Sequence, residues 1–377
     1  MSYKKEIEFK QKPSLKGREI TGATIYRLKI PLNMAFTISL GSTDFYDAVV
    51  VELRFSDIIG YGEAETVQQI TGETPEVLFD VSAGILASME GQSFESVEDV
   101  SLFITSFCHG NNAAKSAVDM AFHDALGKMH GISVADLLGG SMRPRITSFT
   151  IPIGDVNENL KLLDRYQKAG ARIIKVKVGK SATKDAERLT VIAGKLDDGV
   201  TFFADANQGY RLTDAVKISE ILYRNEALFF EQPMIRNDLV AFRNLRRKAG
   251  IPIMLDESIS SPKDVLDAVC ADAADMVNVK LSKSGGIRNA IKTLVAAQAA
   301  GLDAMVGCML ESKLGIAASL AVANAVNNVK YTDLDGFTYL TEQPFDGGVE
   351  LRSGTDYPVD GSGLAVKRNK DIGQLNF

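Results

Sequence analysis

Three acidic residues follow short apolar runs at nearly constant intervals, and they offer the clearest chemistry in the chain. They are Asp205, Glu231 and Asp256. Carboxylates gathered at one place repel one another unless a cation lies between them. Oxygen ligands without histidine or cysteine suit a hard cation, and Mg²⁺ is the expected one. The pattern predicts a Mg²⁺ site with Asn207 and Asn278 as hydrogen-bonding neighbours, although any one acid could instead cap the following helix.

Lysines flank the three acids on both sides. Lys175 and Lys177 share one face of the predicted strand before the acids, and Lys280 ends a run after them. A lysine serves as a base near neutral pH when burial and neighbouring cations lower its pKa from about 10.4 towards roughly 7–8. The alternatives are a surface strand with two solvated lysines and, for Lys280, an ion pair with Asp256 or Glu257.

A divalent cation between two amine bases suits one kind of reaction. The cation binds a carboxylate and stabilises the enediolate that forms when the neighbouring α-proton leaves. One lysine, from the Lys175 and Lys177 pair or Lys280, removes the proton from one face, and the lysine on the other side returns a proton to the opposite face. The expected result is inversion of the α-carbon, as in racemisation or epimerisation, because a single-faced reaction needs only one base.

The elements that would gather these residues repeat along the chain. Eight short apolar runs alternate with helical stretches of about the length that one strand, one helix and two loops require. The runs are 147–153, 173–178, 201–205, 228–231, 252–256, 276–280, 304–307 and 329–333. This alternation predicts the α/β class and a (β/α)₈ (TIM-like) barrel, whose active site lies at the carboxyl ends of the strands.

The N-terminal third follows another plan. Alternating apolar and polar residues predict strands at 22–32, 47–55 and 58–63, with a mobile loop at 33–46 between the first two. Amphipathic stretches at 75–89, 97–107 and 113–130 predict three helices, and Thr74 is a candidate cap for the first. This part is therefore an α+β unit joined to the barrel.

Composition excludes several classes of protein. The chain has 377 residues and a net charge of −6, so it lacks the basic excess of a nucleic-acid-binding protein. It has no long apolar run and no secretory leader, which predicts a cytoplasmic protein without a membrane partner. Its three cysteines lie far apart without a Cys-x-x-Cys motif, which argues against a disulfide framework or a thiolate metal site.

The Lys175-Val176-Lys177 motif, the three acids and Lys280 together resemble the enolase superfamily, in its muconate-lactonizing-enzyme-like subgroup. The resemblance covers nearly the whole chain. It implies an N-terminal α+β capping domain at 1–140, a barrel at 141–335 and a C-terminal segment at 336–377 that returns to the cap. It also implies Mg²⁺ as cofactor and a homo-oligomer.

A pair of acids at the end of the last apolar run points to one group within this superfamily. Asp333 and Asp335 resemble the Asp-x-Asp motif of dipeptide epimerases, in which two carboxylates hold the free α-ammonium of a dipeptide. The same likeness implies that Thr150 and Lys175 contact the substrate. It also implies that the stretch from Cys308 and Met309 to Leu310 lines the pocket. The alternative for the two acids is a solvated loop.

One departure from the pattern bears on the substrate. Epimerases that act on Ala-Glu can carry an arginine in the cap loop, where this chain has Gly41, and residues 31–53 contain no lysine or arginine. The resemblance thus implies an L,L-dipeptide whose C-terminal residue is small, hydrophobic or cationic rather than acidic. Asp44 and Asp47 keep the cationic choice open.

Three other functions remain open from the sequence. The same scaffold serves o-succinylbenzoate synthases or N-succinylamino acid racemases, and muconate cycloisomerases. These substrates have no free ammonium, which would leave Asp333 and Asp335 without a purpose. A catalytically retired small-molecule-binding barrel is the non-enzymatic alternative, and the complete set of bases and metal ligands argues against it.

Overall fold

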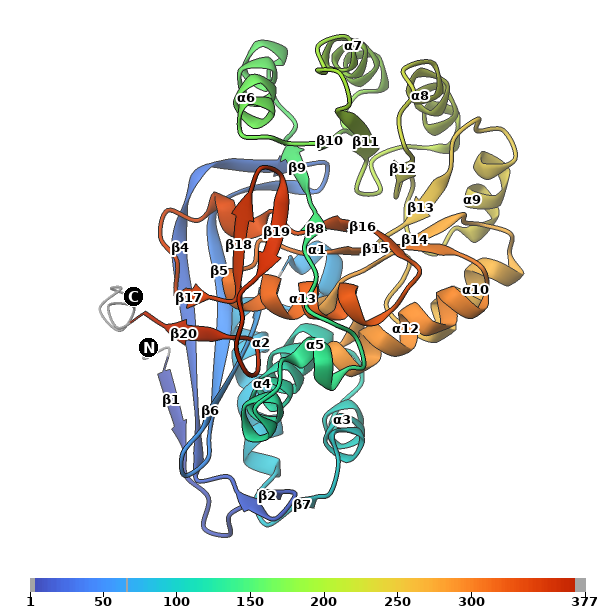
Figure 1. Ribbon diagram of the computed structural model, residues 1–377. Helices are drawn as coiled ribbons and strands as arrows, with labels where there is room; N and C mark the ends of the chain where they lie inside the picture. Colours follow the sequence, from blue (N-terminus) through green and yellow to red (C-terminus); the bar gives the residue numbers. More distant parts are fainter. Residues whose placement is uncertain (1–3, 66, 370–377) are drawn as a thin grey trace.

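The computed structural model describes residues 4–65 and 67–369, and these form an antiparallel sheet with helices beside a parallel barrel. Figure 1 shows the long blue strands of the N-terminal sheet on one side and the barrel elements, from green to orange, on the other. The predicted fold class is confirmed. The division at residues 140 and 335 stays a prediction, and its parts at 1–3, 66 and 370–377 lie outside the described residues.

The N-terminal sheet has four strands in the order β1-β4-β5-β6. Its central pair, β4 (Gly22–Ile38) and β5 (Gly41–Arg54), is longer than predicted. The loop expected at 33–46 is wrong, because Phe36 pairs with Thr43 and Ile38 with Gly41 to continue the hairpin. The two residues at its tip, Ser39 and Leu40, are not the Asn-Gly or Asp-Gly pair typical of a two-residue hairpin turn, and Gly41 to Asp44 in the second arm favour a loop. The outer strands are β1 (Lys4–Ile7) and β6 (Ile59–Glu65).

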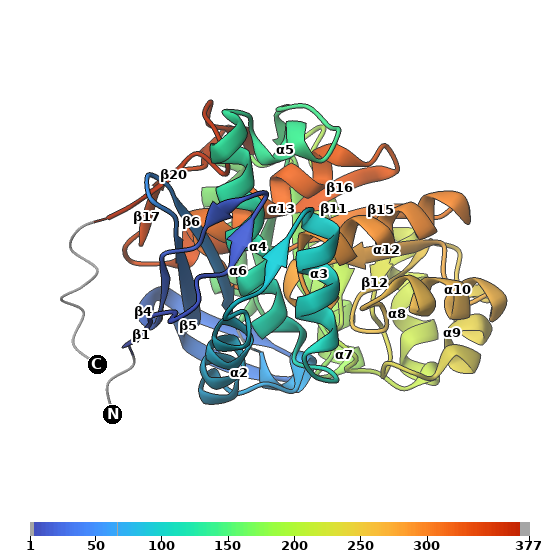
Figure 2. The ribbon, with the colours of Figure 1, turned by 90° about the horizontal axis from the view of Figure 1, so that it is seen from below.

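Three helices cover one face of this sheet at the positions that the sequence predicts. The first is α2 (Pro75–Ser88), capped by the side chain of Thr74, which accepts a hydrogen bond from the Val77 amide. The others are α3 (Val97–Ser106) and α4 (Asn112–His130), and Figure 2 shows the three beside the sheet. The smaller elements are α1 (Gln68–Thr71), α5 (Val134–Leu137), β2 (Ser14–Leu15), β3 (Arg18–Glu19) and β7 (Ser93–Phe94).

The barrel has eight parallel strands paired in chain order. They are β9 (Ser148–Ile151), β10 (Ile173–Lys177), β11 (Thr201–Asp205), β12 (Phe230–Glu231), β13 (Ile253–Leu255), β14 (Met276–Val279), β15 (Asp303–Gly307) and β16 (Val329–Asp333). A parallel bridge between Thr147 and Thr332 joins the last strand to the first. Each predicted run therefore contains or overlaps a strand, and the carboxyl ends of all eight meet at one mouth.

Helices separate successive strands of the barrel. They are α6 (Val156–Lys168), α7 (Ala182–Ala193), α8 (Leu212–Arg224), α9 (Leu239–Arg246), α10 (Pro262–Cys270), α11 (Leu281–Ser284), α12 (Ile287–Ala299) and α13 (Lys313–Ala325). A separate buried cluster lies among the strands, formed by Phe203, Phe229, Met254, Met276 and Met305. Bulky side chains of this kind fill the interior of such a barrel, which leaves the polar residues at the strand ends.

The chain after the barrel returns to the N-terminal sheet. The 3₁₀ turn η1 (Gly336–Tyr339) is followed by β17 (Phe345–Gly347), β18 (Val349–Arg352), β19 (Thr355–Pro358) and β20 (Val366–Arg368). Strand β19 pairs with β8 (Arg145–Ile146). The Arg368 guanidinium lies 2.8 Å from Glu52 and over the ring of Tyr26, both on the N-terminal sheet. Within residues 4–65 and 67–369, no helix combines the length and the apolar character needed to cross a bilayer.

Strand β6 packs against α4 at a distance that only glycine permits. A Cβ atom at Gly62 would overlap the carbonyl oxygen of Ala117, and one at Gly60 would overlap that of Ala121. Both obstacles are backbone atoms of a long helix and cannot rotate away. This contact fixes the sheet on α4, and thereby the part of β6 that reaches the mouth of the barrel.

We expect Gly62→Ala to lower the free energy of unfolding by about 1–3 kcal/mol, because overpacking forces the helix and strand apart. Thermal denaturation should show a melting temperature several degrees below that of the wild type. Gly154→Ala is the matched control, since a Cβ atom there meets its nearest neighbour, Asn159 Nδ2, at 3.5 Å. Equal melting temperatures for the two variants would contradict the close contact.

Candidate active site

A cavity of about 360 Å³ opens between the strand ends of the barrel and the β4–β5 hairpin. From the barrel it is lined by Thr150, Lys175, Lys177, Asn207, Lys280, Cys308, Met309, Leu310, Asp333, Asp335, Gly336 and Tyr339. From the N-terminal part it is lined by Phe36, Ile38, Leu40, Gly41, Ser42, Thr43, Phe45, Asp47, Glu65, Val67, Gln68, Gln69, Ile70 and Pro75. The sequence predicted nearly all of the barrel side and little of the other.

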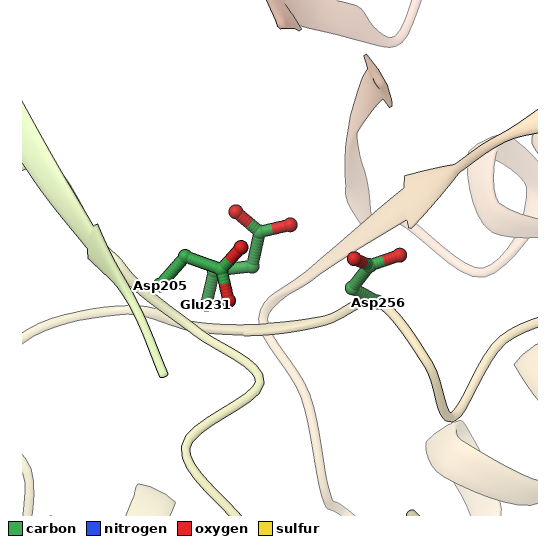
Figure 3. A group of neighbouring side chains, drawn as sticks. All are labelled: Asp205, Glu231 and Asp256. Carbon is green, nitrogen blue, oxygen red and sulfur yellow. The ribbon is translucent and has the colours of Figure 1, made fainter. Parts of the chain in front are cut away.

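The three acids predicted as metal ligands lie together at this mouth. Asp205, Glu231 and Asp256 are fully buried, and each offers a carboxylate oxygen within 4.8 Å of the others. Figure 3 shows the three side chains reaching the same region from neighbouring strand ends. Within the described part of the chain, Glu231 Oε2 and both carboxylate oxygens of Asp256 have no partner with hydrogen-bond geometry, and their close neighbours are the ammonium groups of three lysines at 2.5–3.0 Å. Buried oxygens of this kind, without nitrogen or sulfur ligands, fit a hard divalent cation.

The two asparagines that the sequence suggested as neighbours hydrogen-bond to two of the three acids, one through its side chain and one through its backbone amide. Asn278 donates to Glu231 Oε1 at 2.7 Å, and the backbone amide of Asn207 donates to Asp205 Oδ1 at 2.8 Å. The Asn207 side chain bridges further, donating to Glu257 and accepting from Lys177. These contacts fix which carboxylate oxygens remain turned towards the centre of the group.

The acids titrate differently because their neighbours differ. Burial raises the pKa of Asp205, but the charges of Lys175 and Lys177 outweigh burial and lower the pKa to about 2. Burial and the adjacent charge of Asp205 together raise the pKa of Glu231 to about 8. The group therefore resists carrying three negative charges on its own. A bound cation favours the ionised form of each acid.

Lys175 occupies the centre of the acidic group. Its ammonium lies 2.7 Å from Asp333, 3.0 Å from Asp205 and 3.0 Å from Glu231, and its side chain is 1% exposed. Lys177 lies on the same face of β10, with its ammonium 2.7 Å from Asp205 and 3.1 Å from Asn207 Oδ1. The surface-strand alternative for this pair is excluded, because both side chains are buried.

Lys280 approaches from the opposite part of the barrel, four strands along from β10. Its ammonium lies 2.8 Å from Asp256 Oδ2, so the ion pair that the sequence allowed is present. Lys283, one helical turn after Lys280, was not predicted as part of the site. The Lys283 ammonium lies 2.5 Å from Asp256 Oδ1 and also donates to the backbone carbonyl oxygens of Asp256 and Asn278. The Lys-x-x-Lys spacing was the available signal.

Lys280 and Lys175 hold their protons more tightly than the sequence predicted, because the pKa of each is raised rather than lowered. Burial lowers the pKa of Lys280, but the charge of Asp256 outweighs burial, and the pKa rises above its usual value. Lys175 behaves in the same way under the charges of Asp205 and Asp333. The chain's own groups therefore favour the ammonium form. A lowered pKa depends on the positive charge of a bound cation.

Asp333 and Asp335 stand at the end of β16 and face the cavity. Asp333 accepts hydrogen bonds from Ser148 at 2.6 Å and from Lys175 at 2.7 Å. Asp335 accepts from the Thr150 amide at 2.8 Å and from the hydroxyl of Tyr339 at 3.2 Å. Both are at most 4% exposed, so they do not belong to a solvated loop. Burial and the charge of Asp333 raise the pKa of Asp335 to about 7.

The segment after β15 completes the barrel side of the cavity. Cys308 and Met309 are buried there, and the Cys308 amide donates to the Asp333 carbonyl oxygen at 3.1 Å. This hydrogen bond places the segment beside the paired aspartates. Burial raises the pKa of the Cys308 thiol well above its usual range, so it acts as a neutral wall of the pocket.

Two carboxylates from β6 accept hydrogen bonds from the backbone between β15 and the first turn of α13. Neither was predicted from the sequence as part of the site. Glu63 accepts from the amides of Ser312 at 2.8 Å and Gly315 at 3.2 Å, at the start of α13. Glu65 accepts from the Leu310 amide at 2.8 Å. The partners are about 250 positions apart in the chain, so no local spacing signals them. The cap thus helps to position the wall of the pocket.

The tip of the β4–β5 hairpin closes over the other side of the mouth. The Ser39 hydroxyl donates to the Asn207 carbonyl oxygen at 2.7 Å, and the side chain of Ser39 lies against Gly179. Nearer the base of the hairpin, the ring of Phe36 packs edge-on against Tyr339 at 5.1 Å. The hairpin therefore spans the mouth of the barrel from the end of β16 to the end of β11.

Comparison with known proteins agrees with this geometry. Residues 159–372 match the family described as enolase C-terminal domain-like, and residues 20–139 match the mandelate racemase / muconate lactonizing enzyme N-terminal domain. The L-Ala-D/L-Glu epimerase of Bacillus subtilis is 31% identical over 347 residues, which are 90% of this chain and 94% of that protein. The hydrophobic dipeptide epimerase of Enterococcus faecalis is 33% identical over 337 residues, 86% of this chain and 92% of that protein.

A solved structure shows the same fold with a ligand. The dipeptide epimerase of Cytophaga hutchinsonii, complexed with Mg and the dipeptide D-Ala-L-Val, superimposes with a TM-score of 0.90 at 31% identity. The match covers 93% of this chain and 96% of that one.

We expect Mg²⁺ to raise the melting temperature of the wild-type protein, because a ligand that binds the folded state stabilises it. The gain is roughly 1.4 kcal/mol at ten times the dissociation constant. Glu231→Gln should fold but lose this shift, since it removes one ligand charge. Glu187→Gln, an exposed glutamate on α7, is the matched control and should keep the shift. An unchanged response in Glu231→Gln would contradict the assigned metal site.

Proposed function

We propose that this chain, which belongs to the mandelate racemase / muconate lactonizing enzyme family of the enolase superfamily, is a Mg²⁺-dependent dipeptide epimerase. Its relatives are epimerases and racemases, which are isomerases that act on amino acid derivatives. The proposed reaction inverts the α-carbon of the C-terminal residue of an L,L-dipeptide by 1,1-proton transfer. The observation that carries the proposal is the meeting of metal ligands, two lysines and paired aspartates in one cavity.

The charges of the cavity match those of a dipeptide. Asp333 and Asp335 offer buried carboxylates to the free α-ammonium, and the Lys175 ammonium separates Asp333 from the metal ligands. A dipeptide held there by its ammonium extends its carboxylate towards Asp205, Glu231 and Asp256. The α-carbon of its C-terminal residue then lies between the aspartate pair and the three metal ligands. Asp333 already has Lys175 as an ion-pair partner, but among the described residues Asp335 has only hydrogen bonds and no ion pair. A substrate without an ammonium would leave Asp335 without a cation, which disfavours the synthase and cycloisomerase alternatives.

The three acids hold the metal in this scheme. Asp205, Glu231 and Asp256 would hold a Mg²⁺ ion beside the substrate carboxylate. Its positive charge would favour the negative charge that develops there when the α-proton leaves. Asn278 and the Asn207 amide keep the ligands oriented by their hydrogen bonds. Lys175 lies among the same carboxylates and is placed to contact the substrate carboxylate as well.

The two bases act from opposite parts of the barrel. Lys177 ends β10, and Lys280 directly follows β14. One enters the reaction as a neutral amine and takes the α-proton, and the other enters as an ammonium and delivers a proton to the opposite face. They exchange these roles for the reverse reaction. Burial of both side chains limits exchange with bulk water while the α-carbon is deprotonated.

The proposed preference for the C-terminal side chain follows from the hairpin. Phe36, Ile38 and Leu40 give the roof of the cavity an apolar surface. Among the described lining residues, the lysines are those of the barrel, and the hairpin contributes no lysine or arginine. A carboxylate side chain under this roof would lose its hydration without gaining a partner, which is unfavourable. We therefore propose a small, hydrophobic or cationic C-terminal residue.

Two single variants test whether the lysines act as separate bases. Lys177→Gln and Lys280→Gln should each lower epimerisation by about 10²–10⁴-fold, the usual contribution of a general acid or base. Each should still exchange the α-proton of one diastereomer in D₂O with Mg²⁺, followed by mass spectrometry. Lys184→Gln, an exposed lysine on α7, is the control. Equal loss of exchange with both diastereomers would contradict the two-base scheme.

A second measurement tests the side-chain preference. We expect kcat/KM for L-Ala-L-Phe and L-Ala-L-Lys to exceed that for L-Ala-L-Glu by at least about tenfold, a difference of roughly 1.4 kcal/mol. The reason is the absence of a cap cation for the glutamate side chain. Fastest turnover of L-Ala-L-Glu would show that another group receives the acidic side chain.

A further inference from the structure

The N-terminal domain contributes an acid to the cavity that the proposed reaction does not use. Glu65 ends β6, lines the cavity and is 3% exposed. Its Oε2 accepts the Leu310 amide, and no ion pair to it exists within residues 4–65 and 67–369. Asp47 lines the same wall but is compensated, because Arg27 donates to both of its carboxylate oxygens at 2.6 Å.

Glu65 lies near the end of the cavity where the α-ammonium of the substrate is proposed to bind. Leu310, its hydrogen-bond partner, lines the cavity just after β15. The amide of Cys308 in the same segment donates to the Asp333 carbonyl oxygen. Glu65 therefore lies in the sector of the mouth that holds the paired aspartates. A dipeptide whose α-ammonium meets those aspartates turns the side chain of its N-terminal residue towards this sector.

We propose that Glu65 binds a cationic side chain on the N-terminal residue of the dipeptide, so that the preferred substrates begin with lysine or arginine. This inference rests on the proposed function and extends it to the other residue of the substrate. Asp333 and Asp335 already receive the α-ammonium. Glu65 remains for a second positive charge, that of a side-chain ammonium or guanidinium.

The electrostatics of the wall support this assignment. Burial raises the pKa of Glu65 well above its usual range, and the charges of Glu311, Asp47 and Glu63 raise it further. The Leu310 amide acts in the opposite direction. A cation brought by the substrate would offset the cost of ionising a buried acid. If Glu65 served only to accept the Leu310 amide, a neutral glutamine would suffice without that cost.

The test compares dipeptides that differ only in their first residue. Deuterium exchange in D₂O with Mg²⁺ is measured for L-Lys-L-Ala, L-Arg-L-Ala, L-Leu-L-Ala and L-Ala-L-Ala. The wild type should favour the lysine and arginine dipeptides over L-Leu-L-Ala by about tenfold or more in kcat/KM, mainly through a lower KM. Glu65→Gln retains an acceptor for the Leu310 amide but loses the charge. It should reduce the ratio of L-Lys-L-Ala to L-Leu-L-Ala about tenfold, whereas Glu187→Gln should preserve it.

Two outcomes overturn the inference in distinguishable ways. If the wild type exchanges L-Ala-L-Ala but shows no preference for a cationic first residue, the epimerase function stands and the role of Glu65 is wrong. The same holds if Glu65→Gln slows all four dipeptides equally, because a purely structural acceptor would do that. If the wild type exchanges none of the four, the proposed function fails and this inference fails with it. If the variant does not fold, the wild-type kcat/KM values for the lysine and arginine dipeptides against L-Leu-L-Ala still test the predicted preference.

Discussion

The arrangement of charge at the mouth of the barrel is the constraint on which the rest of the structure depends. Asp205, Glu231 and Asp256 are buried within one small region, where three uncompensated negative charges would be strongly unfavourable. Lysines interleave with them, and Lys175 alone contacts two of the three. Glu231 still holds its proton more tightly than an ordinary glutamate. The site is thus suited to accept additional positive charge, which in the proposed reaction a metal ion and an ammonium substrate would supply.

Such a charge pattern is maintained only on a rigid frame. Parallel strands paired in chain order bring each functional side chain to the same mouth, and the aromatic and methionine cluster below fills the interior. The N-terminal domain adds a second constraint through Glu63, which accepts backbone amides at the start of α13. The close contact of Gly62 with α4 fixes the strand that carries Glu63. The cap is therefore a structural part of the active site as well as its roof.

The sequence predicted the barrel side of the site because its signal is local. Strands β10 to β14 and β16 each end in a polar residue or are followed directly by one, so Lys177, Asp205 and Lys280 could be placed at the mouth from periodic spacing. The tip of the β4–β5 hairpin was missed because residues that favour a loop, such as Gly41 and Asp44, lie within β5. The glutamates of β6 were missed because their partners are distant in the chain. The lysine pKa values depend on the full set of buried charges, which a linear pattern does not reveal. Long-range contacts and electrostatics therefore needed the structure.

The division between barrel and cap also separates chemistry from selectivity. The barrel supplies groups that any α-proton transfer next to a carboxylate requires, and their positions follow from strand geometry. The cap supplies the apolar roof of Ile38 and Leu40 and the acid Glu65, and in the proposed reaction these residues would contact only the variable parts of a substrate. A change in the hairpin or at the end of β6 can alter which side chains fit without moving a base or a metal ligand. Glu63 of the cap also hydrogen-bonds to the segment after β15. A change at Glu63 would therefore alter both the chemistry and the selectivity.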